Sequence, residues 1–205
     1  MKIAILGATG RVGAGFLELA LSKGHSVKAL MRKPTRRKPS SQLEIIIGDA
    51  KNQETIATLL KDVDVVFSAL NTDQTTTLTE ATSHLIEEMT NQNITRIVTI
   101  GTAGILESRA EPGKLRYLSS ESRQKVKFAA NEHAAVYRQL KHSSLQWTII
   151  CPTALINGKK TGIYRYEKDY LPTNGMKISV LDTAALGYEA AIHNLFLYHR
   201  VGIAY

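Results

Sequence analysis

Three glycines near the start of the chain have a spacing that could hold a phosphate group. The segment GATGRVG places Gly7, Gly10 and Gly13 at the spacing G-x-x-G-x-x-G. The first two glycines can form a tight turn that leaves the backbone room for a pyrophosphate, and the third allows close packing of helix on strand. The next helix would present free N–H groups to the phosphates. A plain glycine-rich turn is the alternative. We expect contacts to a dinucleotide from the residues of this turn: Gly7, Ala8, Thr9, Gly10, Arg11 and Val12.

The segment that follows favours one form of the dinucleotide. Sites that prefer NAD usually carry an acid at the end of the second strand, where it accepts a hydrogen bond from the ribose 2′-hydroxyl. Residues 27–33 contain no acid and offer Arg32 and Lys33 instead. A guanidinium group binds a phosphate through charge-assisted hydrogen bonds, and Arg11 could assist from the side. The alternative is a solvated basic loop. We expect NADP(H) to be favoured over NAD(H).

The elements around these residues alternate between short, continuous apolar runs and longer amphipathic segments. The apolar runs, that within residues 43–47 included, suit strands that are buried on both faces of a sheet. Strands are predicted over residues 2–6, 25–31, 43–47, 64–70, 94–100 and 146–151, strand-like segments over 162–166 and 177–180, and a last strand near 201–204. Helices are predicted over residues 11–23, 52–60, 78–91, 124–142 and 183–194, with Gly24 ending the first. This order predicts one α/β domain over residues 1–205, with a Rossmann-type, doubly wound, mostly parallel sheet. Ligands should lie at the carboxyl ends of its strands.

The chain also resembles a known family. GATGRVG, together with IIGDA, DVVFSAL and LQWTIICPTA, resembles the short-chain dehydrogenase/reductase superfamily. The similarity is strongest to its atypical branch of compact NAD(P)H-binding proteins, which includes NADPH-dependent flavin/biliverdin-IXβ reductase and NmrA-like proteins. It covers nearly the whole chain, and the glycine motif is its most specific part.

The resemblance assigns roles to residues at later strand ends. It implies that Asp49 and Ala50 lie against the adenine, and that Ala69, Leu70 and Asn71 line the path of the adenosine and ribose. It places Thr102 near the nicotinamide, where it is our catalytic candidate, and Cys151, Pro152 and Thr153 along the nicotinamide amide. We expect the electron acceptor to bind mainly to segments after residue 102, with Tyr164, Tyr166 and Tyr170 as candidates for its outer wall.

One apparent catalytic motif is rejected on geometry. Tyr137 and Lys141 match the Tyr-x-x-x-Lys pair with which many members of the superfamily reduce ketones. A helix between two parallel strands begins near their carboxyl ends and finishes at the opposite edge of the sheet. Lys141 comes only four residues before the strand that begins near Leu145, so the pair should lie several turns from the cofactor, at about 1.5 Å per residue. We expect no Tyr-x-x-x-Lys catalytic pair.

Composition argues against several other functions, namely nucleic-acid binding, metal binding and membrane anchoring. The net charge is +8, but five basic residues crowd into residues 32–38 and only 6% of the chain is aromatic, which argues against nucleic-acid binding. The six histidines show no metal-ligand spacing, and no apolar stretch suggests a membrane anchor. The single cysteine fits a reducing compartment, so we expect a cytoplasmic protein.

These observations support two hypotheses. The first is an oxidoreductase that passes a hydride from NADPH to a flavin, a quinone or a similar conjugated small molecule. The second is a non-catalytic NADP(H)-sensing regulator of the NmrA-like type, which would contact a protein partner. Oxidation of NADPH in the presence of flavin would separate them.

Overall fold

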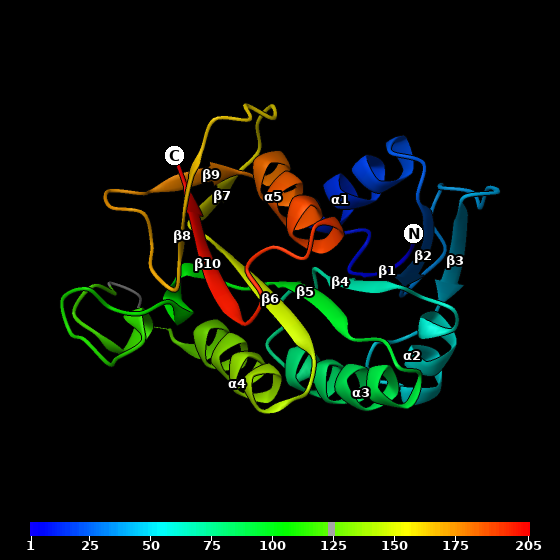
Figure 1. Cartoon of the computed structure of the whole chain (residues 1–205), viewed down its shortest axis with the longest axis horizontal. Coiled ribbons are helices and arrows are strands. Elements are labelled where there is room, and N and C mark those ends of the chain that lie inside the picture. The colour runs from blue at the N-terminus through cyan, green and yellow to red at the C-terminus, as the bar shows by residue number, and fades with distance from the viewer. Residues whose placement is uncertain (123–125) are drawn as a thin grey trace.

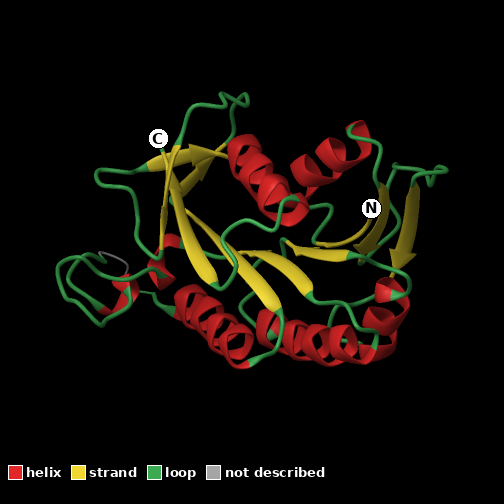
Figure 2. Cartoon of the chain, viewed as in Figure 1, coloured by secondary structure: helices red, strands yellow, loops and turns green. Residues whose placement is uncertain are grey.

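Strands and helices alternate along the chain in the computed structural model, which describes residues 1–122 and 126–205 (Figures 1 and 2). The strands are β1 (Lys2–Leu6), β2 (Ser26–Met31), β3 (Leu43–Ile47), β4 (Val65–Ser68), β5 (Arg96–Ile100), β6 (Gln146–Pro152), β7 (Ala154–Ile156), β8 (Arg165–Lys168), β9 (Lys177–Ser179) and β10 (His199–Ala204). The helices are α1 (Arg11–Ser22), α2 (Gln53–Leu60), α3 (Thr77–Asn91), α4 (Phe128–His142) and α5 (Val180–Ile192). Two 3-10 helices, η1 (Ala103–Ile105) and η2 (Arg116–Leu118), follow β5.

One eight-stranded sheet organises the molecule, in the order β3-β2-β1-β4-β5-β6-β10-β8. Neighbouring strands run parallel except for β8, which pairs antiparallel with β10. Strands β7 and β9 form a separate parallel pair. The strand order reverses at β1, whose neighbours are β2 and β4, and such a reversal opens a crevice at the carboxyl ends of the strands. The predicted Rossmann-type architecture is confirmed.

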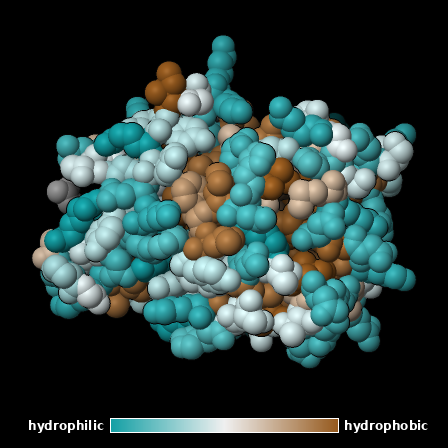
Figure 3. All heavy atoms as spheres, in the orientation of Figure 1, coloured by the Kyte–Doolittle hydropathy of each residue, from teal (hydrophilic) through white to brown (hydrophobic). Residues whose placement is uncertain are grey.

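Helices cover both faces of the sheet. Helices α1 and α5 lie on one face, and α2, α3 and α4 lie on the other (Figure 1). On the first face Phe16 of α1 stacks on Phe67 of β4, with ring centroids 3.7 Å apart. On the face shown in Figure 3, many of the hydrophobic side chains at the surface lie in the middle of the molecule, between the two helical layers. Over residues 1–122 and 126–205, no helix is long and apolar enough to cross a membrane.

Apart from shifts of one or two residues at element ends, the predicted elements differ from the structure in five places. Strand β3 was expected to be buried on both faces, but it forms an edge of the sheet, where Ile47 is half exposed. The strand predicted at residues 162–166 is β8, a few residues later, and β7 was not predicted. Helix α4 begins at Phe128, and residues 124 and 125 of the predicted helix lie outside the described residues. Helix α5 begins three residues early because the Ser179 hydroxyl accepts from the N–H of Asp182 and caps it.

The carboxylate of Asp182 ties the C-terminal part of the chain together. It is fully buried, and it accepts hydrogen bonds from the N–H groups of Thr161 and Gly162 and from the hydroxyls of Thr161, Ser179 and Tyr205. Burial by itself would raise its pKa, but the hydrogen bonds from Gly162, Tyr205 and Thr161 outweigh burial and lower the pKa to about 2. The ionised carboxylate therefore holds a loop, a helix N-terminus and the last residue in one place.

This carboxylate should make stability depend on acidity. The folded pKa of Asp182 lies below the unfolded value of ~3.9, so its contribution is complete above about pH 4 and is lost as the pH falls toward about 2. Asp182→Asn should lower the free energy of unfolding at neutral pH by about 2 kcal/mol and flatten its dependence on pH in that window. Urea unfolding at several pH values measures both effects.

The exposed Asp62 provides the control, because Asp62→Asn removes one carboxylate without touching this cluster. Equal acid sensitivity of the Asp182→Asn variant and the unmodified protein would show that Asp182 does not stabilise the fold in this way.

Candidate functional site

The predicted phosphate turn connects β1 to α1 and lies directly against the end of β4. Gly7 has a φ of +73°, and a Cβ atom on it would lie 2.4 Å from the carbonyl oxygen of Ala69. A Cβ atom on Gly13 would lie 2.1 Å from the carbonyl oxygen of Gly7. Both distances are far inside contact, so only glycine allows the helix and the two strand ends to approach this closely. This is the cradle that a bound pyrophosphate requires.

The N-terminus of α1 faces the same turn without a capping side chain. Gly10 occupies the N-cap position, and the first turn carries no acid, so neither an intrahelical carbonyl nor a carboxylate meets the first N–H groups. The side chains of Ala8 and Val12 are buried, and Arg11 donates from Nη1 to the carbonyl oxygen of Leu155 in β7 at 3.3 Å. Ala8 and Val12 can therefore offer a phosphate mainly their backbone N–H groups, and the contacts of all three predicted residues stay predictions.

A cavity of about 450 Å³ opens beside this turn, at the carboxyl ends of β1 to β4. Nine predicted residues line it: Gly7, Thr9, Gly10, Arg32, Asp49, Ala50, Ala69, Leu70 and Asn71. Lys33 is exposed and does not line it. The lining also contains residues that the sequence analysis missed: Leu30, Gly48, Lys51, Thr72, Asp73, Thr75 and Thr77. The cavity is of ordinary size for a small-molecule site, and the glycine cradle at its floor fits the diphosphate of a dinucleotide.

Positive charge is available at the far side of this cavity. Arg32 is exposed at the end of β2, and within the described part of the chain it makes no ion pair. Arg37, five residues later, is instead held by Glu18 of α1. The lining itself contains two acids. Asp49 accepts from the N–H of Lys51 at 2.9 Å, which closes the turn after β3. The guanidinium of Arg32 is thus left available for an anion.

The second acid of the lining, Asp73, belongs to a threonine-rich turn that leads into α3. Its carboxylate accepts from the hydroxyl of Thr75 at 2.7 Å and from the hydroxyl of Thr77 at 2.8 Å. These hydrogen bonds, that from Thr75 first, lower the pKa of Asp73. The turn is therefore fixed by an ionised side chain. The local signal was an acid followed by threonines two and four residues later, a pattern typical of turns that precede a helix.

A second cavity, of about 340 Å³, lies at the ends of β5 and β6. It is lined by residues after 101, among them the predicted Thr102, Pro152 and Thr153. Thr102 caps η1, since its hydroxyl accepts from the N–H of Gly104 at 3.4 Å. Thr153 donates from its hydroxyl to the carbonyl oxygen of Ile203 at 3.4 Å. The two hydroxyls thus occupy neighbouring strand ends beside an open space.

Other predicted residues of this region lie elsewhere. Cys151 is fully buried, and burial raises the pKa of its thiol to about 12, so its side chain is an inert part of the core. The three tyrosines do not form the outer wall. Tyr164 packs on the core, Tyr166 contacts Phe196, and Tyr170 lies under Arg109. The wall comes instead from residues that had no local sequence signal, namely Arg116, Tyr117, Glu121, Leu171, Gly175 and Met176.

The Tyr137 and Lys141 pair lies far along α4, as its register predicted. Lys141 is in the last turn of the helix. The Tyr137 ring packs edge-on against Trp147 at 5.8 Å and under the guanidinium of Arg200 at 4.2 Å. Neither residue lines either cavity, and no lysine lines the second cavity among residues 1–122 and 126–205. Tyr137 is therefore a packing residue.

Comparison with known proteins finds relatives that share the whole fold. YwnB of Bacillus subtilis, an uncharacterized protein, is 28% identical over 189 residues, which cover 90% of this chain and 87% of YwnB. The solved structure of a "putative exported protein" from Burkholderia pseudomallei superimposes with a TM-score of 0.86 and 29% identity, over 100% of both chains. A "putative NADH-flavin reductase" from Streptococcus pneumoniae superimposes with a TM-score of 0.81 and 26% identity, over 100% of this chain and 99% of that one.

A family model described as NAD(P)H-binding matches residues 7–194, a span that includes the glycine cradle and both cavities. The chain therefore belongs to the NAD(P)H-binding family within the atypical short-chain dehydrogenases/reductases.

Proposed function

We propose that this protein is an NADPH-dependent reductase that transfers a hydride to a flavin, a quinone or a similar conjugated acceptor. The observation that carries the proposal is that two cavities lie next to each other at the carboxyl ends of the strands of one sheet. The first has the glycine cradle and Arg32. The second has two strand-end threonines, and within the described part of the chain no Tyr-x-x-x-Lys pair lines it. The likeness to a "putative NADH-flavin reductase" supports the same chemistry.

The residues of the first cavity would bind and orient the nucleotide. The N–H groups at the start of α1 and the glycine backbone would hold the pyrophosphate, and Arg32 would pair with the 2′-phosphate. The nicotinamide, when bound, supplies the hydride. Thr102 and Thr153, at the ends of β5 and β6, would fix the orientation of the ring through their hydroxyls. Asp73 stays ionised on its threonines and keeps the turn beside the adenosine in place.

The second cavity favours an acceptor that needs little help with protons. Reduction of a ketone places negative charge on one oxygen atom and needs a matched proton donor. A flavin or quinone spreads the incoming charge over its conjugated ring, and one hydride with one solvent proton completes its two-electron reduction. For such an acceptor, holding the two rings at contact distance provides most of the catalysis. Tyr117 lines the cavity, and among residues 1–122 and 126–205 no lysine lines it with Tyr117.

A panel of acceptors tests this proposal. With NADPH and purified protein, we expect oxidation of the nucleotide in the presence of FMN, FAD or a quinone, and little with simple ketones. The measurement is the loss of nucleotide absorbance. Ketone reduction with inert flavins and quinones would overturn the mechanism, and Tyr117→Phe would then show whether Tyr117 is the donor. Silence across the panel despite tight NADPH binding would favour the nucleotide-sensing regulator with a protein partner.

The nucleotide preference has its own test at Arg32. Arg32→Ala should raise the Kd for NADPH roughly tenfold, because a charge-assisted hydrogen bond contributes ~1.5–3 kcal/mol, and should leave the Kd for NADH nearly unchanged. Arg36→Ala is the matched control, since Arg36 is an exposed arginine of the same loop that does not line the cavity. Calorimetric titration gives the four affinities. Equal affinity of the unmodified protein for the two nucleotides would contradict the preference.

A further inference from the structure

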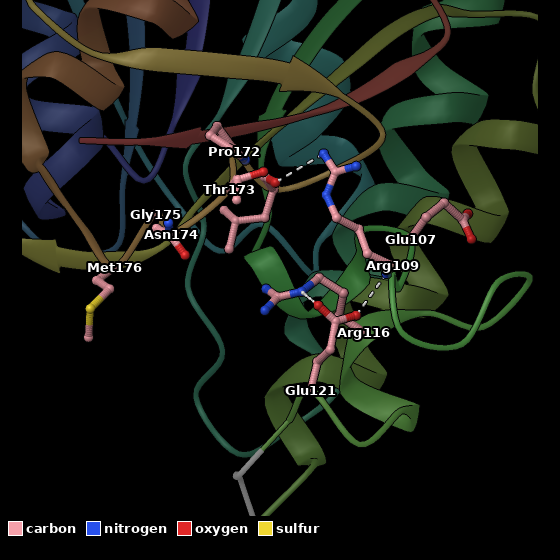
Figure 4. Close-up of a pocket in the computed structure, with 10 residues that line it drawn as sticks. Glu107, Arg109, Arg116, Glu121, Pro172, Thr173, Asn174, Gly175 and Met176 are labelled. Atoms are coloured by element: carbon pink, nitrogen blue, oxygen red, sulfur yellow. Dashed lines mark hydrogen bonds and ion pairs between the residues drawn. The ribbon is translucent and has the colours of Figure 1, made fainter.

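A third cavity, of about 350 Å³, adjoins the second (Figure 4). The two share five lining residues: Arg116, Glu121, Leu171, Gly175 and Met176. One side of the third cavity is the loop over residues 107–121, and the other is the turn over residues 171–176. The second and third cavities are therefore neighbours, and the region beside these five residues is their shared space.

The loop over residues 107–121 is held in one shape by its own hydrogen bonds. The N–H of Ser108 donates to the carbonyl oxygen of Lys114, and the N–H of Arg116 donates to that of Leu106, both at 2.8 Å. Glu111 accepts from the N–H of Ser120 and from Nζ of Lys114, each at 2.7 Å. A ligand that binds to this loop would meet groups that are already in place, which reduces the entropy lost on binding.

Arg116 presents unused donors to the shared space. Its Nε donates to Glu121 at 3.3 Å, and its two terminal nitrogens have no partner among residues 1–122 and 126–205. In Figure 4 these nitrogens point away from Glu121, into the space between the loop and residues 172–176. A guanidinium group with two free terminal nitrogens suits the bidentate binding of a phosphate or carboxylate.

The acids of the third cavity already have partners. Glu107 accepts from Nη2 of the buried Arg200 at 2.6 Å. Glu121 accepts from the hydroxyl of Ser108 and from the N–H of Arg109 at 2.9 Å, besides Arg116. Burial would raise the pKa of Glu121, but the hydrogen bonds from Ser108 and Arg116 lower it on balance. The ionised Glu121 thus fixes the direction of Arg116, and the charge of Glu107 is balanced by Arg200.

We propose that the acceptor carries an anionic group, a phosphate or a carboxylate, which binds the terminal nitrogens of Arg116 while the ring of the acceptor occupies the second cavity beside Thr102. This inference rests on the proposed reductase function and narrows its substrate class. Leu171 and Met176, which line both cavities, provide an apolar wall for the chain that joins the ring to the anion.

Two flavins that share one ring system test the inference. FMN carries a terminal phosphate, and riboflavin ends in a hydroxyl. In the unmodified protein saturated with NADP⁺, we expect FMN to bind roughly tenfold more tightly than riboflavin, as followed by quenching of flavin fluorescence. Arg116→Gln should abolish this difference by weakening FMN alone, and Arg116→Lys should retain part of it. Arg138→Gln is the control, since it removes one exposed arginine from α4, away from the three cavities.

The outcomes separate this inference from the function on which it rests. If both flavins are reduced with equal KM and bind equally, the anion site is wrong and the reductase stands. If Arg138→Gln weakens FMN as much as Arg116→Gln does, the effect is one of net charge and the site is again wrong. If neither flavin binds or is reduced, and quinones are inert as well, both the reductase function and the anion site are overturned.

Discussion

The contact between the turn after β1 and the end of β4 determines where a ligand can bind in this molecule. The backbone of Gly7 lies so close to the carbonyl of Ala69 that a Cβ atom would approach it to 2.4 Å, and Gly13 brings α1 equally close to the turn. Because the strand order reverses at β1, the same contact places the N-terminus of α1 over the crevice of the sheet. Without it, α1 would stand away from the sheet and its free N–H groups would lose the cavity that they face.

The second half of the site depends on buried charges instead of glycines. Arg200 of β10 donates to the carbonyl oxygen of Ile105 at 2.5 Å, to Glu107 at 2.6 Å and to Asp169 at 3.2 Å. These bonds join η1, the 3-10 helix after Thr102, to strand β10 and to the segment before residues 171–176. Removing a partner from such a buried cluster is costly, because it leaves a charge without compensation. The second cavity is therefore positioned by charged side chains, whereas the first is positioned by the close packing of glycine backbone.

The sequence could predict the parts of the site that are local. Short segments of sequence are enough to identify the glycine turn and the absence of an acid before Arg32. They also identify the strand ends at Asp49, Ala69 and Thr102. Edge position is not local, and β3 therefore looked like an interior strand although it pairs only with β2.

The residues that form the wall of the second cavity could not be predicted from the sequence, because they come from distant parts of the chain. Arg116 and Met176 are 60 positions apart in the chain. They line the same cavity because η2 and the turn after β8 both lie at the carboxyl ends of β5 and β6. Tyr164, Tyr166 and Tyr170 were the predicted wall residues. Their rings instead pack on the core, on Phe196 and under Arg109. The direction of a side chain in an irregular segment depends on tertiary contacts, and no periodicity reports them.

The proposed reductase function requires the nucleotide to lie in the first cavity with its nicotinamide at the entrance to the second, which is left for the acceptor, and a crystal structure of the protein with bound NADP⁺ tests this most directly. We expect the pyrophosphate at the N-terminus of α1, the 2′-phosphate within hydrogen-bond distance of Arg32, and the nicotinamide between Thr102 and Thr153 with one face open to the second cavity. A nicotinamide that turns away from the ends of β5 and β6, or a 2′-phosphate that leaves Arg32 without contact, would contradict it.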